Sequence, residues 1–236
     1  MTVKVLHSRS QIKSARKQLR SMGASCLTPT TVRILRRLGL SHGINVGDYI
    51  KSWDVLETAR FLLKYLPKDA PVLDLGAHCS EILHTLRRLG YSRLSGVDLN
   101  PNIRSMPSAD AIQYHVSNFL ESPFPDESFK GITAISVIEH GFVGTQLLSE
   151  ISRLLAAGGY FTASFDYWPE KVDTSGIQLF GMDWKIFSNE EVLSFIQDAS
   201  DWGLTPIGDI HLEATDKVVH WGNKSYTFAW IAFRKG

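Results

Sequence analysis

The chain contains little cysteine and no long apolar run. Cys26 and Cys79 are the only cysteines among 236 residues, so the sequence offers one possible disulfide and none of the paired spacings that bind zinc. This usage favours a reducing compartment, and we expect the cytoplasm. The longest dense apolar stretch, residues 133–138, has the length of a strand and falls far short of the roughly 20 residues that span a bilayer. We expect a globular chain without a membrane span, large enough for one α/β domain with an appendage.

Acidic residues are missing from the first 47 positions. Nine basic residues precede Asp48, the first acid, so this arm carries +9, and the remaining chain, with 16 basic and 24 acidic residues, carries −8. Three interpretations stay open: a basic face docked on the acidic body of the same protein, a surface for an anionic partner such as nucleic acid or acidic lipid, or an Arg-rich targeting peptide. A secretory signal is excluded because no apolar segment follows the basic residues.

Helical periodicity predicts three helices before the first strand of the body. They are expected near residues 8–22, 28–38 and 53–66. In the second helix, Val32, Leu35 and Leu38 are expected to face inward. We place a domain boundary near residue 50, so that 1–50 forms a basic helical extension and 51–236 forms the main domain.

From residue 71 onward, short apolar segments alternate with amphipathic ones. Strands are expected at 71–75, 94–98, 111–116, 131–137, 159–165, 205–211 and 226–233, and helices at 79–90, 101–106, 144–156 and 188–200. This alternation predicts a Rossmann-like, doubly wound, mostly parallel sheet of seven strands, whose last two strands form an antiparallel hairpin at one edge. The carboxyl ends of the parallel strands then share one edge of the sheet, where ligands bind.

The turn after the first of these strands is expected to face a ligand. In VLDLGAHCSEIL, residues 72–83, Gly76 removes a side chain where the backbone approaches a ligand, and the following helix offers free N–H groups. Asp74 can order this loop or bind a cation. The segment lacks G-x-G-x-x-G, so on its own it also fits a plain turn between a strand and a helix.

The end of the second strand strengthens the assignment of a ligand site. GVDLN places Asp98 at this end, 22 residues after Gly76. A carboxylate there can accept hydrogen bonds from both hydroxyls of a ribose. An ordinary turn aspartate before Pro101 is the alternative, but the two segments together favour a ligand of the adenosine type.

The motifs follow one another in an order that resembles a known family. VLDLGA, GVDLN, PFPDESF, SVIEHG and LLAAGGYFTAS resemble the class I S-adenosylmethionine-dependent methyltransferases of the broad type 11 group. The resemblance covers residues 51–236. It implies a methyltransferase that uses S-adenosyl-L-methionine as its cofactor.

The resemblance also implies which residues bind the cofactor. The matching positions are Asp74, Gly76, Ala77, His78, Asp98, Leu99, Asn118, Phe119, Ser136 and Val137. By resemblance, Asp74 and Gly76 lie at the methionine end and Asp98 at the ribose. Asn118 stands at the adenine amino group, where the family usually has an aspartate.

Three positions depart from the family pattern. His78 and Ser80 replace two usual glycines, and Lys130 stands where an aspartate commonly follows the Phe. A dinucleotide needs a close backbone approach to its pyrophosphate, which a side chain at position 78 hinders, whereas a methyl donor has no phosphates. This favours methyl transfer over hydride transfer. A cofactor-binding protein without catalysis is the remaining alternative.

Methyl transfer to an oxygen of high pKa needs alignment and a base. His140 and Glu139, at the end of the fourth strand, are the catalytic candidates, and a packing role is the alternative for His140. We expect the methyl acceptor to bind to the aromatic-rich insertion 166–187 and to the loop 209–225 near the end of the sequence. The candidate acceptor residues are Asp166, Tyr167, Trp168, Trp184 and His220. We predict no metal site, because no spacing of His and acidic residues fixes one.

The reaction expected from these residues is O-methylation of a small molecule or a glycan. The alternative is an RNA or protein methyltransferase that grips phosphates with the basic arm. The arm lacks interleaved aromatic residues for base stacking, so nucleic acid is not the favoured partner.

Overall fold

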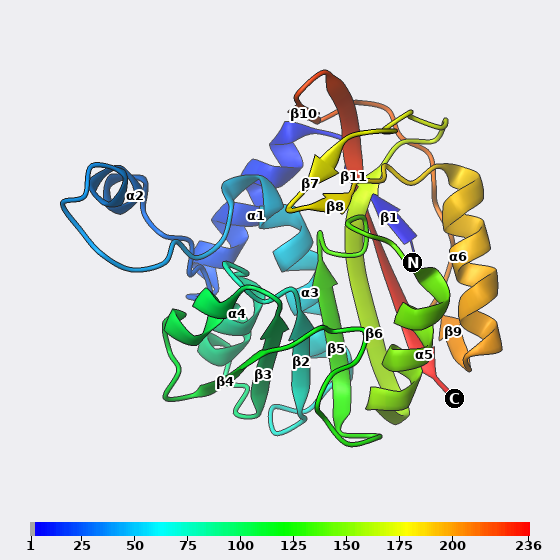
Figure 1. Ribbon diagram of the computed structural model, residues 1–236, viewed down its shortest axis with the longest axis horizontal. Helices are drawn as coiled ribbons and strands as arrows, with labels where there is room; N and C mark the ends of the chain where they lie inside the picture. Colours follow the sequence, from blue (N-terminus) through cyan, green and yellow to red (C-terminus); the bar gives the residue numbers. More distant parts are fainter. Residues whose placement is uncertain (1–2) are drawn as a thin grey trace.

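A nine-stranded sheet forms the centre of the computed structural model, which describes residues 3–236 (Figure 1). The strand order is β1-β11-β6-β5-β2-β3-β4, and β9 and β10 also pair with β11. The strands are β1 (Val3–Val5), β2 (Val72–Leu75), β3 (Leu94–Asp98), β4 (Ile112–Val116), β5 (Phe129–Ile135), β6 (Leu155–Tyr167), β9 (Leu204–Pro206), β10 (Val219–Trp221) and β11 (Lys224–Lys235). A separate hairpin joins β7 (Gln178–Leu179) to β8 (Met182–Asp183).

The parallel pairs β2–β3, β3–β4, β2–β5 and β5–β6 form the body of the sheet, and β11 runs antiparallel to β6. These strands coincide with the apolar segments of the sequence, so the predicted Rossmann-like, mostly parallel sheet is confirmed. The antiparallel edge is more elaborate than the expected hairpin. β11 is 12 residues long, and the short strands β10, β1 and β9 each pair with part of its outer side.

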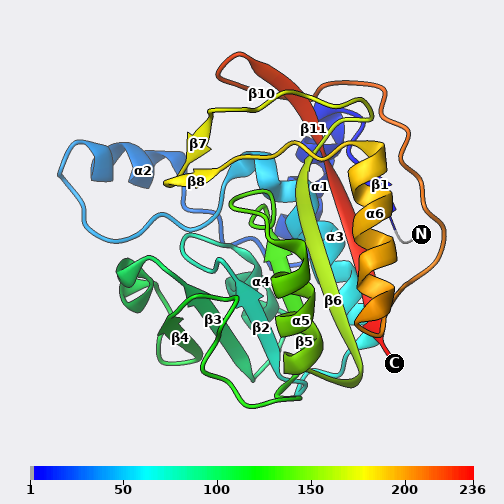
Figure 2. The same cartoon turned by 45° about the vertical axis from the view of Figure 1, so that its right-hand side comes forward.

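Helices cover both faces of the sheet (Figures 1 and 2). They are α1 (Arg9–Ser21), α2 (Thr30–Arg37), α3 (Ser52–Tyr65), α4 (Ile82–Arg88), α5 (Gly144–Leu154) and α6 (Asn189–Asp201), with 3-10 turns η1 (Tyr49–Lys51) and η2 (Pro101–Ser105). α1, α3 and α4 pack together on one face, and α5 and α6 pack on the other. Within residues 3–236, no helix has both the length and the apolar character needed to cross a membrane.

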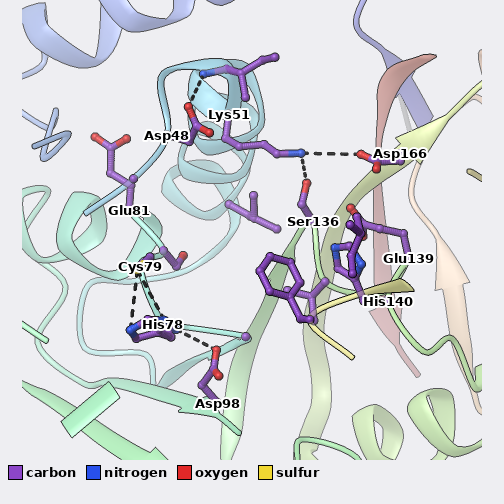
Figure 3. A pocket seen from close by; sticks show the side chains of 18 of the residues that line it. Asp48, Lys51, His78, Cys79, Glu81, Asp98, Ser136, Glu139, His140 and Asp166 are labelled. Carbon is purple, nitrogen blue, oxygen red and sulfur yellow. Dashed lines mark hydrogen bonds and ion pairs between the residues drawn. The ribbon is translucent and has the colours of Figure 1, made fainter. Parts of the chain in front are cut away.

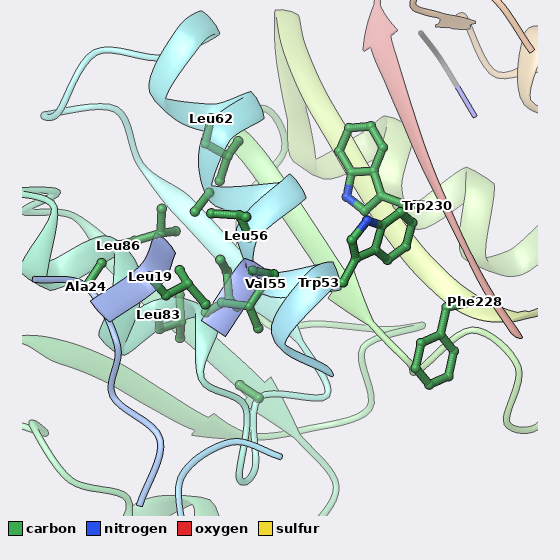
Figure 4. Close-up of a cluster of buried hydrophobic side chains, with 14 of the residues drawn as sticks. Leu19, Ala24, Trp53, Val55, Leu56, Leu62, Leu83, Leu86, Phe228 and Trp230 are labelled. Atoms are coloured by element: carbon green, nitrogen blue, oxygen red, sulfur yellow. The ribbon is translucent and has the colours of Figure 1, made fainter. Parts of the chain in front are cut away.

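Strand β11 contributes to both halves of the hydrophobic core, because alternate side chains of a strand point to opposite faces. Phe228 and Trp230 belong to the cluster formed with α1, α3 and α4, and Ile231 and Phe233 belong to the cluster under α5 and α6. Figure 4 shows the first cluster, to which Trp53 of α3 and Trp230 of β11 both belong. The sheet is therefore buried on both faces, and only the ends of its strands are free to build a site.

The basic arm is built into this body. Val3 pairs with Ile231 in the sheet, and α1 packs on α3. The ammonium of Lys4 pairs with Glu57, and the guanidinium of Arg16 pairs with the carboxylate of Glu81. Part of the arm's charge is thus neutralised by the body of the same chain. Residues 1 and 2 lie outside the described residues, and the boundary near residue 50 stays a prediction.

Helix α2 is oriented differently from the prediction. The expectation that Leu35 and Leu38 face inward is wrong, because both side chains are exposed. Arg33 and Arg36 point toward the loops that flank the helix instead and donate to backbone carbonyls there, including those of Thr28 and His42. These hydrogen bonds turn the apolar side of the helix outward, and Figure 1 shows α2 standing away from the sheet.

Candidate functional site

A cavity of about 1180 Å³ opens at the carboxyl ends of the parallel strands (Figure 3). Its wall is formed by the turns after β2, β3, β5 and β6, by residues 45–51, and by the start of β11. The structure brings most of the predicted site residues onto this wall. They are Gly76, His78, Asp98, Leu99, Phe119, Ser136, Val137, Glu139, His140, Asp166 and His220.

The other predicted residues lie behind or beside the wall. Asp74, Ala77, Tyr167 and Trp184 are buried, Trp168 is half-buried, and Asn118 is exposed. Burial raises the pKa of Asp74 to about 7, and the hydroxyl of Thr133 donates a hydrogen bond of 2.6 Å to this carboxyl. The ring of Tyr167 points into the core because alternate residues of β6 face opposite sides of the sheet. The cofactor and acceptor roles of these residues stay predictions.

The turn after β2 is fixed by hydrogen bonds to the end of β3. Asp98 accepts a hydrogen bond from the backbone N–H of His78 on Oδ2 (3.0 Å) and from that of Asn100 on Oδ1 (2.7 Å). Gly76 has a φ of +67°, and a Cβ there would lie 2.4 Å from a methyl group of Val137. The single glycine of this turn is therefore required by the backbone angle and by the close approach of the neighbouring strand.

The donors and acceptors around Asp98 fit a ribose. A carboxylate offers about four lone-pair directions, and the two backbone donors use one on each oxygen. The remaining lone pairs can accept hydrogen bonds from two adjacent hydroxyls. Leu99 and Phe119 add apolar side chains to the same wall. This end of the cavity therefore suits adenosine, whose ribose is polar and whose base has two apolar faces.

The opposite end of the cavity contains a lysine that the sequence analysis missed. The ammonium of Lys51 contacts the hydroxyl of Ser136, lies 3.8 Å from Oδ1 of Asp166, and lies 3.4 Å from the centre of the Phe228 ring (Figure 3). An ion pair and a cation–π contact together hold the ammonium in place. Only the placement of η1 over the sheet edge brings Lys51 here, and the sequence offers no motif that marks it.

Two buried carboxyl groups face this lysine. Burial raises the pKa of Glu139 well above its usual range, and the nearby Asp166 adds to the rise. Burial also raises the pKa of Asp166, while Lys51 and the indole N–H of Trp184, 2.8 Å from Oδ2, oppose the rise. Within residues 3–236, Oε2 of Glu139 has no hydrogen-bond partner. This carboxyl is therefore poised to pair with a polar group of a ligand.

His140 completes this end of the cavity. Burial lowers the pKa of its imidazole to about 4, and the charge of Lys51 contributes, so the ring is neutral at pH 7. The backbone on both sides of His140 is held by the insertion, through Lys185 N–H to Glu139 O (2.9 Å) and Gly141 N–H to Asp183 O (2.8 Å). A neutral, positioned imidazole in a cavity can accept a proton.

Strained backbone occurs at two wall positions. Ser136 has a φ of +52° and Cys79 a φ of +64°, although neither is a glycine. Such residues cost on the order of 1–3 kcal/mol each and cluster at functional sites. In the described part of the chain, no group of three or more His, Cys, Asp or Glu side chains is placed to hold a metal ion.

Comparison with known protein families agrees with this geometry. Residues 73–163, from β2 into β6, match the sequence profile of a family described as a methyltransferase domain. This part of the chain is similar to a methyltransferase domain. The resemblance to class I S-adenosylmethionine-dependent methyltransferases is confirmed by this match. A comparison with curated proteins gives no significant match.

Solved structures share the fold of the methyltransferase domain at low sequence identity. Geranyl diphosphate C-methyltransferase from Streptomyces coelicolor A3(2), in complex with Mg²⁺, geranyl diphosphate and S-adenosyl-L-homocysteine, is 18% identical, with a TM-score of 0.56 over 98% of this chain and 100% of that chain. A protein described as a sarcosine dimethylglycine methyltransferase from Galdieria sulphuraria is 16% identical, with a TM-score of 0.56 over 88% and 99%. An S-adenosylmethionine-dependent methyltransferase from Mesorhizobium loti is 14% identical, with a TM-score of 0.51 over 75% and 96%.

Proposed function

We propose that the protein methylates a hydroxyl group of a small molecule, with a sugar or another polyhydroxylated ring as the preferred acceptor. The observation that carries this proposal is the neutral imidazole of His140 in the same cavity as the ribose-type carboxylate of Asp98. A hydroxyl needs a base at the moment of transfer, whereas a free amine already has its lone pair. The cavity volume of about 1180 Å³ suits a cofactor and a small acceptor together.

In this proposal the cofactor lies along the strand ends. Asp98 accepts hydrogen bonds from the ribose hydroxyls, and Leu99 and Phe119 cover the adenine. Gly76 and Val137 lie beneath the methionine end. When bound, S-adenosylmethionine supplies an electrophilic methyl group on a sulfonium, and the chain supplies alignment and a proton acceptor.

His140 is proposed as the base. Its Nδ1 is enclosed by protein, so we assign Nε2 as the atom that takes the proton of the acceptor hydroxyl. Burial, with a smaller contribution from the charge of Lys51, keeps the imidazole neutral. Glu139, whose Oε2 has no hydrogen-bond partner within residues 3–236, is assigned to a polar group of the bound ligand. The ring of Phe180 lies perpendicular to the imidazole, with 5.4 Å between the ring centres, and partly covers this side of it.

The acceptor end offers the contacts that sugars use. The aromatic side chains of Tyr226, Phe228 and Trp221 line the cavity, and Asp166 and His220 can hydrogen-bond hydroxyl groups. Trp184 is proposed to position Asp166 for the acceptor, because its indole N–H donates a hydrogen bond to the Asp166 carboxylate.

Nucleic acid is the less favoured acceptor. Arg16 of the basic arm is buried against Glu81, and the half-buried Arg33 and Arg36 donate to loop carbonyls, so these three guanidinium groups make their hydrogen bonds within the chain and not to phosphate oxygens. Both cysteines are free thiols, which supports the cytoplasm as the compartment.

The test is methyl transfer from labelled S-adenosylmethionine to a panel of sugars, sugar nucleotides, phenols and amines. His140→Gln should lower kcat by about 10²–10⁴-fold while the affinity for S-adenosylhomocysteine is kept. The rate of the unaltered enzyme should fall as pH drops toward about 4, where the imidazole becomes protonated. His42→Gln, an exposed histidine outside the cavity wall, is the matched control. Full activity of His140→Gln, or methylation of amines alone, would contradict the proposal.

A further inference from the structure

Helix α2 exposes its apolar side to solvent, whereas a helix of a globular protein normally packs its apolar side against the core. With about 100° between successive residues, Ile34, Leu35 and Leu38 share one side of the helix. Their side chains are 53%, 42% and 66% exposed, and Leu40, which follows the helix, is 72% exposed. Globular proteins rarely expose a contiguous group of large aliphatic side chains without a binding role.

The other side of α2 is basic. Arg33 and Arg36 donate to the neutral carbonyls of Thr28, Val46, His42 and Ile44, which hold the guanidinium groups without cancelling their charge. The exposed Arg37 adds a third charge, and residues 1–47 contain no acid. Helix α2 therefore has an exposed aliphatic side and, on its other side, the positive charge of three arginines.

The mouth of the cavity lies next to this helix. Arg33, Asn45, Gly47 and Asp48 belong to the cavity wall. Two further aromatic side chains of the wall are exposed, Phe180 between β7 and β8 (86%) and Trp221 at the end of β10 (47%). Exposed apolar side chains thus occur on several separate segments around one opening.

We propose that α2 docks the protein on an anionic membrane surface. An amphipathic helix with an aliphatic face and a basic face buries its apolar side chains at the level of the lipid headgroups, and the negative surface attracts the positive charge of the other face. A second copy of the chain fits less well, because a symmetric dimer through α2 would bring the two basic helices together. Docking places the cavity mouth at the membrane, and a lipid-anchored acceptor can then present its polar head, a consequence that rests on the proposed function.

The test is flotation of the full-length protein with phosphatidylcholine vesicles, with or without phosphatidylglycerol. We expect binding to vesicles that contain the anionic lipid and much weaker binding to the neutral vesicles. Leu38→Asp combined with Leu40→Asp should lower the partition coefficient at least about tenfold, because two aliphatic side chains no longer enter the lipid. Leu193→Asp, at a position of α6 with 48% exposure, is the matched control and should bind as the unaltered protein does.

Each other result overturns the inference. Absence of binding, equal binding to neutral vesicles, or equal loss in Leu193→Asp would exclude α2 as an anionic-membrane surface. A concentration-dependent dimer that the double variant abolishes, without vesicle binding, would assign the exposed aliphatic side of α2 to a second copy. Circular dichroism of every variant checks that the fold is kept. The assay uses no methyl transfer, so docking and the proposed function can fail separately.

Discussion

The buried ion pair between Arg16 and Glu81 makes a quantitative prediction about how the basic arm stabilises the fold. Two parallel hydrogen bonds of 2.7 Å join the guanidinium of α1 to the carboxylate that precedes α4. The backbone N–H of Cys26 also donates to this carboxylate (2.7 Å), and the guanidinium donates to the hydroxyl of Ser52 (3.0 Å). Both charged side chains are almost completely buried, so neither can exchange its partner for water.

Removing one partner leaves the other charge buried and unpaired. Arg16→Met is therefore expected to lower the free energy of unfolding by about 3–5 kcal/mol, and Glu81→Gln by a similar amount. In the double variant neither charge of the pair remains, and the amide oxygen of the glutamine can still accept a hydrogen bond from the backbone N–H of Cys26. The double variant should therefore be more stable than either single variant, with a loss of about 1–2 kcal/mol.

Urea unfolding at pH 7, followed by far-UV circular dichroism and tryptophan fluorescence, measures these values. Arg87→Met is the control, because Arg87 pairs with Asp110 on the surface and should contribute only about 0–1 kcal/mol. A loss below about 1 kcal/mol for Arg16→Met, or a double variant whose loss equals the sum of the single losses, would refute the ion pair as the link between arm and body.

Two further predictions concern Asp54 and Gly76. Burial raises the pKa of Asp54 to about 7, so the folded protein loses stability as pH rises from about 4 through 7. Asp54→Asn should therefore raise the free energy of unfolding by about 2–4 kcal/mol at pH 8 and leave it unchanged near pH 4. Thermal unfolding at both pH values checks this. Gly76→Ala should cost about 1–3 kcal/mol and weaken S-adenosylhomocysteine binding, measured by calorimetry, because φ is +67° and the new Cβ meets Val137. Adding Val137→Ala should recover only the steric part of that loss.

The sheet could be predicted from the sequence because its strands are buried on both faces and appear as continuous apolar runs. β2, β3 and β11 begin within a few residues of their predicted positions. β1 was missed because it has only three residues and pairs with β11, more than 200 positions away. The outward face of α2 was also mispredicted: periodicity shows that one side is apolar, but not which side the neighbouring carbonyls hold.

The cofactor end of the site was more predictable than the acceptor end. Asp98 and Gly76 lie in local motifs whose spacing has a chemical reason. Lys51 carries no such signal, since its role arises from the contact of η1 with the ends of β5 and β6. The acceptor-side aromatics Tyr226 and Phe228 occupy alternate positions of β11, and only the strand's orientation shows that this side faces the cavity.

The most direct test of the cofactor site is thermal unfolding with and without ligand, measured for the unaltered protein and for Asp98→Ala. S-adenosylmethionine and S-adenosylhomocysteine at 100 times their dissociation constants should each add about 2.7 kcal/mol to the stability of the protein. Asp98→Ala should abolish this gain, whereas Asp69→Ala, on the surface, should keep it. NAD should have no effect. Stabilisation by NAD alone, or no response to either S-adenosylmethionine or S-adenosylhomocysteine, would contradict the assignment of this cavity to S-adenosylmethionine.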